Sequence, residues 1–426
     1  MTITAIIVFC IFALLGMPLA FALGFASLAV LYQADFELVV LAQRMLHAMD
    51  SFPLMAIPLF MLAGELMVKA DMMDRLVAFA NSLVGRVHGG LANVTIIAGT
   101  ILASVTGAAV ASASALGSAL VPALRKHYPD GYNCAVIASA ANLGPVIPPS
   151  NAMIVYALMA GSTVSVGGLF MAGIVPGLIL AAGFMGLASW ISWRRKYPLT
   201  GEAFNAKNAW LQFRRAYIII LMPIIVVGGI IGGIFTATEG AAIAVVYSLL
   251  IGFLVTRKLK CSDIPGILFR AAVSASMVGA LIAFASTVTF VLTIDMVPQQ
   301  LADWVLSLTS DPMVFIWITM ALLVIVGMFM ESNAAYIMLV PLFAPIAVNF
   351  GIDPIWFGFL FMYNLVVGMM TPPVGVLFFV MSGITRTPMG AIVKESMPFV
   401  ILQFIVLALC VIFPGIVTML PRALGF

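Results

Sequence analysis

Apolar residues run almost without interruption along this chain, and polar residues gather in the short stretches between the runs. Many runs reach the ~20 residues that an α-helix needs to cross a bilayer. In the second half they predict spans near 217–235, 238–256, 266–293, 355–381 and 396–420. The pattern predicts an all-α polytopic membrane protein, because the short segments of a transmembrane β-barrel would alternate between apolar and polar residues.

Composition supports this class. Of 426 residues, 64% are hydrophobic and only 8% are charged, whereas soluble domains carry about 25% charged residues. The net charge of +3 gives no indication of nucleic-acid binding. The first apolar run has no basic segment before it and is expected to be an uncleaved span. Four cysteines lie far apart without a CxxC pair and are expected to be buried apolar residues: Cys10, Cys134, Cys261 and Cys410.

Two basic clusters fix the expected topology. Residues 193–217 form the only long polar linker, and 257–270 hold the second cluster. Basic loops stay in the cytoplasm, so 216–256, which is long enough for two spans, is expected to be a hairpin with both ends cytoplasmic.

The two sides of the linker resemble each other. "SALVPAL" matches "IMLVPLF", and "GPVIPPSN" matches "GMMTPPVG", with offsets of 341 − 122 = 219 and 372 − 148 = 224 residues. These matches predict a first repeat at 1–193, a cytoplasmic linker at 194–215 and a second repeat at 216–426. With about five spans each, the second repeat must insert upside down, which is the inverted-repeat layout of secondary transporters. Residues 3–32 are short for two full spans and are expected to hold a kinked pair.

Each repeat is expected to contain a re-entrant helical hairpin. Residues 312–346 form two apolar arms joined by Glu331, Ser332 and Asn333, and 89–126 are their counterpart. The segment 71–86 has apolar residues at helical spacing and charges at its ends. It is interpreted either as a helix on the membrane surface or as a solvated connector.

Each repeat also has a span interrupted by a pair of prolines, at 133–161 and 355–381. A proline lacks the N–H that bonds the carbonyl four residues back, and an unpaired carbonyl survives at membrane depth only inside protein or beside a cavity. The carbonyls expected to be freed are those of Gly144, Pro145, Gly368 and Met369. Beside Asn142 and Thr371 they would suit a small cation, while the restarted half-helix at Ser150 and Asn151 would suit an anion.

The residues "TGAAVASASALGSALVPAL", "GPVIPPSN" and "GMMTPPVG" resemble the large membrane subunit of tripartite ATP-independent periplasmic (TRAP) transporters. The resemblance covers essentially the whole chain. It implies an elevator movement of the hairpins and broken helices against a scaffold, as in the wider ion-transporter superfamily, and uptake of an organic acid coupled to Na⁺ across the bacterial inner membrane. The acid would be a C4-dicarboxylate, sialic acid or another sugar acid. The implied partners are a small four-helix membrane subunit, a periplasmic solute-binding protein and the lipid bilayer.

Carried over by position, the resemblance implies two Na⁺ sites at the hairpin tips and breaks, with a substrate between them. The sodium ligands fall on Ser104, Thr106, Gly107, Asn142 and Gly144 in the first half, and on Gly327, Ser332, Gly368, Met369 and Thr371 in the second. The substrate contacts fall on Ser112, Ser150, Asn151, Asn333 and Thr371. Glu331 has no acidic counterpart in the first tip, so the two sites are not expected to be strictly equivalent.

Other readings stay open. An ATP-driven pump needs a P-loop, which is absent because no lysine follows a glycine. An intramembrane enzyme is not expected, since His47, His88 and His127 are scattered and HExxH and GxSxG are missing. A carboxylate carrier that needs no binding protein, or a cation/proton antiporter, would share the architecture. The antiporter would use acids in or beside apolar runs: Glu65, Glu239, Asp295 and Glu331.

Overall fold

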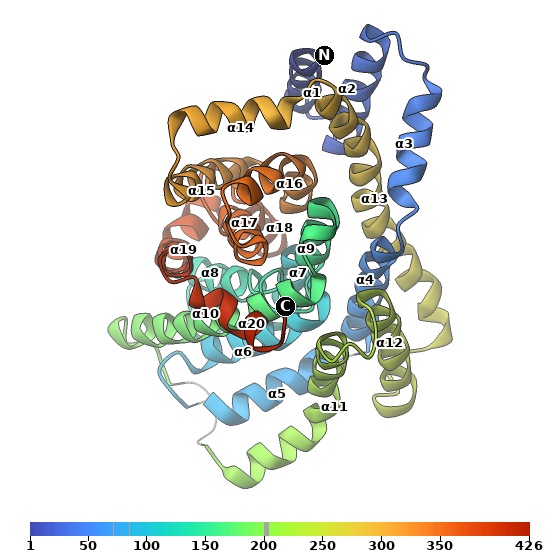
Figure 1. Cartoon of the computed structure of the whole chain (residues 1–426). Helices are drawn as coiled ribbons and strands as arrows, with labels where there is room; N and C mark the ends of the chain where they lie inside the picture. Colours follow the sequence, from blue (N-terminus) through green and yellow to red (C-terminus); the bar gives the residue numbers. More distant parts are fainter. Residues whose placement is uncertain (71, 85, 200–203) are drawn as a thin grey trace.

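Figure 1 shows the computed structural model, which describes residues 1–70, 72–84, 86–199 and 204–426. Every regular element in these residues is a helix. Eight helical stretches among them are long and apolar enough to cross a membrane. The prediction of an all-α polytopic membrane protein is confirmed.

One group of helices forms an outer frame, on the right in Figure 1. Within it α2 and α3 pack against the long helix α13, and α4 packs between α12 and α13. The frame helices are α1 (Thr2–Leu14), α2 (Leu19–Gln33), α3 (Val39–Met49), α4 (Ala56–Lys69), α11 (Ala206–Ile231), α12 (Ala237–Leu250) and α13 (Ile264–Ile294).

The other helices form a core drawn from both ends of the sequence. Within it α8 packs against α19, α7 against α18, and α9 against α16 and α17. The core helices are α6 (Gly90–Thr106), α7 (Ala109–Leu124), α8 (Asp130–Ala141), α9 (Asn151–Ala160), α10 (Val166–Arg194), α15 (Pro312–Phe329), α16 (Ser332–Asn349), α17 (Pro354–Gly368), α18 (Val376–Thr385), α19 (Met389–Ile412) and α20 (Gly415–Ala423). Residues 131–141 of α8 and 356–368 of α17 are all buried, so these two helices occupy the centre.

Two further helices join the frame to the core. Helix α5 (Met72–Val84) precedes α6, and α14 (Val297–Leu308) precedes α15. Figure 1 places α5 below the core and α14 above it. Of the two interpretations of 71–86, the structure has a helix over Met72–Val84, while residues 71 and 85 lie outside the described residues. Helix α14 was not anticipated from the sequence.

The predicted span boundaries hold with two informative differences. The span expected at 396–420 ends at Ile412 because Pro414 disfavours helical geometry in Phe413. Helix α11 begins inside the predicted linker, at Ala206, where the Asn205 side chain accepts hydrogen bonds from the N–H groups of Lys207 and Asn208. The turn after α11 ends in a capping box between Thr236 and Glu239, which starts α12.

The N-terminal segment forms the expected kinked pair, since α1 and α2 have only 13 and 15 residues and are separated by Gly16 and Pro18. The cysteine expectation is half wrong. Cys134 and Cys410 are buried, but Cys10 and Cys261 are exposed. Cys10 lies on a face of α1 that no other described helix covers, and Cys261 lies in the short turn Cys261–Asp263 before α13.

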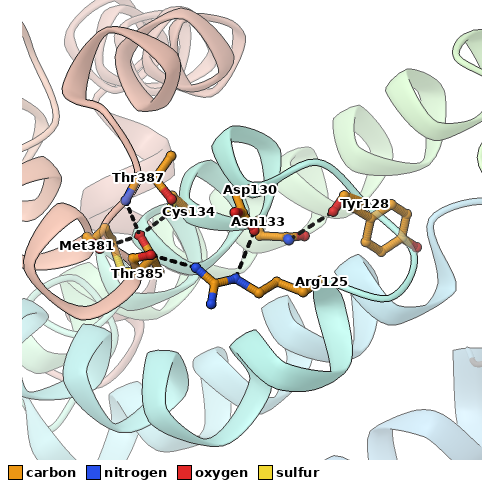
Figure 2. Close-up of polar contacts among 8 residues, drawn as sticks. All are labelled: Arg125, Tyr128, Asp130, Asn133, Cys134, Met381, Thr385 and Thr387. Carbon is orange, nitrogen blue, oxygen red and sulfur yellow. Dashed lines mark hydrogen bonds and ion pairs between the residues drawn. The ribbon is translucent and has the colours of Figure 1, made fainter.

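Figure 2 shows a polar contact that ties the two halves together at one end of the core. The guanidinium of Arg125, just after α7, donates to the Oδ1 of Asp130 (2.9 Å) and to the backbone carbonyl of Thr385 at the end of α18. The thiol of Cys134 lies 3.2 Å from the hydroxyl of Thr385. The end of the second broken helix is therefore held by the first half of the chain.

Candidate functional site

The two interrupted helices are broken where the sequence predicts. The first break covers residues 142–150 between α8 and α9, and the second covers 369–375 between α17 and α18. All four prolines of the two pairs lie in the non-helical segments and not inside a helix. Helix α9 starts at Asn151, and the Ser150 hydroxyl accepts a hydrogen bond from the N–H of Met153, as an N-cap does.

Three of the four freed carbonyls find new partners, which corrects the expectation that these three are unpaired. The carbonyl of Gly368 accepts from the N–H of Thr371 (2.9 Å), and that of Met369 accepts from the N–H of Leu377 (3.2 Å). The carbonyl of Pro145 accepts from the hydroxyl of Ser150 (2.6 Å). A buried carbonyl without a partner is costly, so turns and a side chain replace the missing helical donors. Each carbonyl keeps a second lone pair that can still bind a cation.

The first hairpin tip lies against the start of α9. Gly107 ends α6 in the left-handed region (φ +60°), and its carbonyl accepts from the N–H of Asn151 (3.3 Å). The Asn151 side-chain amide donates to the carbonyl of Thr106 (3.4 Å). The hydroxyls of Thr106 and Ser112 lie 2.7 Å apart. A Cβ at Gly107 would lie 2.9 Å from the Asn151 nitrogen, so only glycine allows this approach.

At the second hairpin tip the carboxylate of Glu331 binds the start of α16. The Glu331 carboxylate accepts from the backbone N–H groups of Asn333 (2.9 Å) and Ala334 (3.3 Å), and from the side-chain amide of Asn333 (2.9 Å). It thereby caps α16. Asn333, which was predicted to contact substrate, is engaged by Glu331 in this structure. The N–H of Gly375 in the second break points to the carbonyl of Met328 in this tip (3.4 Å).

Three asparagines in and near the breaks carry buried side-chain oxygens that have no hydrogen-bond partner among the described residues: Asn142, Asn151 and Asn364. Amide oxygens are hard ligands that suit small hard cations. Asn364 lies one turn before the second break, and its amide nitrogen donates to the carbonyl of Met320 (2.7 Å). The sequence analysis missed Asn364, although an asparagine inside the apolar run "YNLVVGMM" was a visible signal.

The remaining predicted site hydroxyls bond to groups near them in the sequence, and that of Ser332 donates to the Glu331 carboxylate (3.4 Å). Ser104 donates to the carbonyl of Ile101 (2.7 Å) and Thr371 to that of Val367 (2.8 Å). The structure thus brings Thr106, Gly107, Ser112 and Asn151 together at the first tip, and Gly327 and Gly368 together at the second.

All four acids that an antiporter would use have structural partners. Glu65 pairs with Arg270 (2.8 Å), Glu239 closes the capping box of α12, and Asp295 accepts from the hydroxyl of Thr2 (2.7 Å). Glu331 caps α16 and is the one of these four acids that lies at a hairpin tip, so the antiporter alternative depends mainly on this residue.

Comparison with known proteins decides the family. The model of the DctM component of tripartite ATP-independent periplasmic transporters matches residues 6–416. The chain belongs to this family. The TRAP resemblance of its proline and hairpin motifs is thereby confirmed, and the family is one of large permease subunits of transporters and not a family of enzymes.

Relatives carry names for different substrates. The chain is 36% identical to the C4-dicarboxylate TRAP transporter large permease protein DctM of Pseudomonas aeruginosa, with 90% of each chain covered. It is 33% identical to the sialic acid TRAP transporter large permease protein SiaM of Vibrio cholerae, covering 96% of this chain and 95% of the relative. It is also 33% identical to the 2,3-diketo-L-gulonate TRAP transporter large permease protein YiaN of Escherichia coli, covering 95% of both.

Among solved structures, the crystal structure of the Alcanivorax borkumensis YdaH transporter is similar in fold. The TM-score is 0.62 at 15% identity, covering 88% of this chain and 87% of that one. At this identity the likeness concerns the fold alone.

Proposed function

We propose that this TRAP permease subunit carries out sodium-coupled uptake of an organic acid. The observation that carries the proposal is that each hairpin tip lies against a helix break of its own half, with unpartnered asparagine oxygens buried beside both breaks. These oxygens would bind two Na⁺ ions, one at each break, together with the carbonyls and hydroxyls predicted from the sequence.

The substrate is a small organic anion that binds between the two tips. The relatives named above are permeases for C4-dicarboxylates, sialic acid and 2,3-diketo-L-gulonate, all of which are organic acids. The N-terminus of α9, which opens into the first break, offers a positive helix-dipole end to such an anion. Ser112, Ser150, Asn151, Asn333 and Thr371 remain the proposed substrate contacts.

The proposed movement is an elevator motion of the core against the frame, in a protein built from two inverted repeats. Three observations support this. Helices from both halves pack into one core. The helices that enter the two hairpins, α5 and α14, lie at opposite ends of the molecule in Figure 1. Arg75 on α5 donates to the carbonyl of Arg215 at the start of α11, which places α5 on the side of the basic linker.

The proposed partners are a small four-helix membrane subunit and a periplasmic solute-binding protein, in the inner membrane of a bacterium. The isethionate TRAP transporter permease protein DctMQ of Oleidesulfovibrio alaskensis is a longer relative, of which this chain covers 64%. The remaining third of that protein is consistent with a second membrane component fused to a large subunit of this kind.

Uptake into proteoliposomes tests the proposal. The chain is reconstituted with a small TRAP membrane subunit, and a solute-binding protein is added outside with labelled succinate, sialic acid or 2,3-diketo-L-gulonate. Uptake is expected only with an inward Na⁺ gradient, and neither choline nor ATP should replace it. Uptake that proceeds without Na⁺ and is driven by ATP would overturn the proposal. Sodium-driven uptake that needs no binding protein would favour the carboxylate-carrier alternative.

A further inference from the structure

The side chain of Asn142 joins the two halves at the centre of the core. Asn142 ends α8 at the first break and is fully buried. Its amide nitrogen donates to the backbone carbonyl of Val366 on α17 (3.0 Å) and to the Oε1 of Gln403 on α19 (2.7 Å). Both acceptors belong to the second half of the chain, so this amide connects the first break to the helices around the second.

These two acceptors fix which way the amide faces. A side-chain amide presents its oxygen and its NH₂ group on opposite edges. If the Asn142 amide were flipped, its oxygen would face the carbonyl of Val366, which cannot donate. The NH₂ group therefore faces Val366 and Gln403, and the oxygen faces away from them. Among the described residues that oxygen is buried without a hydrogen-bond partner, which is costly unless a ligand satisfies it.

Gln403 is placed to hold this orientation. It is fully buried in α19 within the apolar run "FVILQFIVLALCVI". The nitrogen of its side-chain amide, Nε2, lies 3.4 Å from the sulfur of Met370 in the second break. A glutamine in this run has no lipid-facing or core-packing advantage over leucine, and its strongest contact is the one to Asn142. The sequence analysis missed it, although it is the lone polar residue between 397 and 412.

We propose that Gln403 is a positioning residue for cation binding: it holds the Asn142 amide so that the free oxygen of Asn142 faces the coupling ion at the first break. The proposal rests on the sodium coupling proposed above. Gln403 itself contacts Asn142 and Met370 and not the ion. Removing the contact keeps the Asn142 side chain but lets its amide, and the oxygen with it, rotate away from the ion, which weakens the cation site although Gln403 is not a ligand.

Sodium-dependent melting of the purified full chain in detergent tests this without any transport assay. NaCl replaces choline chloride at constant ionic strength, and the rise of Tm with Na⁺ concentration gives an apparent Kd. Gln403→Met removes the acceptor at similar length and is expected to raise this Kd about 10-fold or more, with Tm in choline little changed. Gln403→Glu keeps an acceptor oxygen in either protonation state and is expected to retain wild-type sodium affinity.

Ser396→Ala is the matched control. Ser396 is buried on the same helix, and its hydroxyl has no hydrogen-bond partner among the described residues. Its loss should leave the sodium Kd unchanged. If Gln403→Met does not fold, Gln403→Asn withdraws the oxygen by one methylene and is expected to weaken sodium binding as well. In an Asn142→Ala background the side-chain oxygen is already absent, so Gln403→Met should cause no further loss of sodium affinity.

The outcomes separate this inference from the function it rests on. A wild-type chain that Na⁺ does not stabilise more than choline overturns the sodium coupling, and this inference with it. Suppose that Na⁺ stabilises the wild-type chain. The role of Gln403 alone is then overturned if Gln403→Met has the wild-type sodium Kd, or if Ser396→Ala weakens sodium binding as much as Gln403→Met does.

Discussion

Gly327 at the second hairpin tip and Gly368 at the end of α17 lie backbone against backbone. A Cβ added to Gly368 would lie 2.6 Å from both the Cα and the carbonyl carbon of Gly327. Backbone atoms cannot move aside as a flexible side chain can, so the tip approaches the break this closely only because neither residue has a side chain.

Gly368→Ala is therefore expected to push the hairpin tip away from the break. We predict a loss of stability of about 1–3 kcal/mol, as overpacking usually causes, together with loss of uptake. Thermal melting and proteoliposome uptake measure the two effects. Gly383→Ala on α18 is the control, because a Cβ there meets nothing within 4 Å; it should keep uptake and preserve or raise stability. Equal changes of stability and uptake in the two variants would contradict the close contact between Gly327 and Gly368.

Arg125→Ala is expected to loosen the contact between α7 and the end of α18 that Figure 2 shows. The guanidinium makes a charged hydrogen bond to Asp130 and another to the Thr385 carbonyl, with 43% of its side chain exposed. Solvent weakens such a contact, so we predict a loss of about 1 kcal/mol. Arg125→Lys should recover only part of it, because lysine cannot bridge both acceptors at once. Thermal melting beside the exposed neighbour Lys126→Ala checks this; equal effects at 125 and 126 would rule out a specific contact.

Opposite orientation of the two hairpins predicts opposite labelling. Exposed Cys10 and Cys261 are first replaced by serine. Single cysteines then replace Lys126 at the base of the first hairpin, Ala206 at the start of α11, and Asp311 at the base of the second hairpin; all three are exposed. An impermeant thiol reagent added from the periplasmic side should label position 311 and not positions 126 and 206. Labelling of 126 and 311 from the same side would refute the inverted repeat.

Glu331→Gln distinguishes a helix cap from a proton carrier. The carboxylate accepts two backbone N–H groups at the start of α16, and a glutamine oxygen can accept them too. We predict that this variant keeps sodium-driven uptake with an unchanged pH profile, whereas Glu331→Ala loses the cap and about 1 kcal/mol of stability. Loss of uptake driven by a proton gradient in Glu331→Gln would instead support the antiporter alternative. Uptake at several pH values, with Na⁺ and proton gradients imposed separately, provides the measurement.

The features that the sequence predicted well are those that local chemistry determines. Prolines, glycines and small polar residues inside apolar runs are incompatible with a continuous span, so the helix interruptions at 142–150 and 369–375 could be located within a few residues. Helix α14 was missed because 297–308 is short and mixes polar with apolar residues. The end of α19 at Ile412 differs from the predicted boundary at 420 because Pro414 ends the helix.

What the sequence could not predict depends on contacts between distant residues. The Met369 carbonyl is satisfied by Leu377 across the break, and nothing in the local sequence indicates that bond. The partnership of Asn142 with Gln403 spans 261 positions and becomes visible only when α8 and α19 are seen side by side. Asparagine oxygens without a partner can likewise be recognised only from the complete hydrogen-bond pattern, because the sequence does not show which atoms of an amide are hydrogen-bonded.

The mixing of the two halves in one core has a consequence for how the protein is made. Helix α8 is buried over residues 131–141 and packs against α19, which the ribosome produces much later. At about 5–20 residues per second, the 261 positions between Asn142 and Gln403 take roughly 10 to 50 s to synthesise. During that interval the newly inserted first half exposes the faces of α7, α8 and α9 to lipid or to the insertion machinery. Assembly of the core is therefore a late event in biogenesis, which begins only when the last helices have entered the membrane.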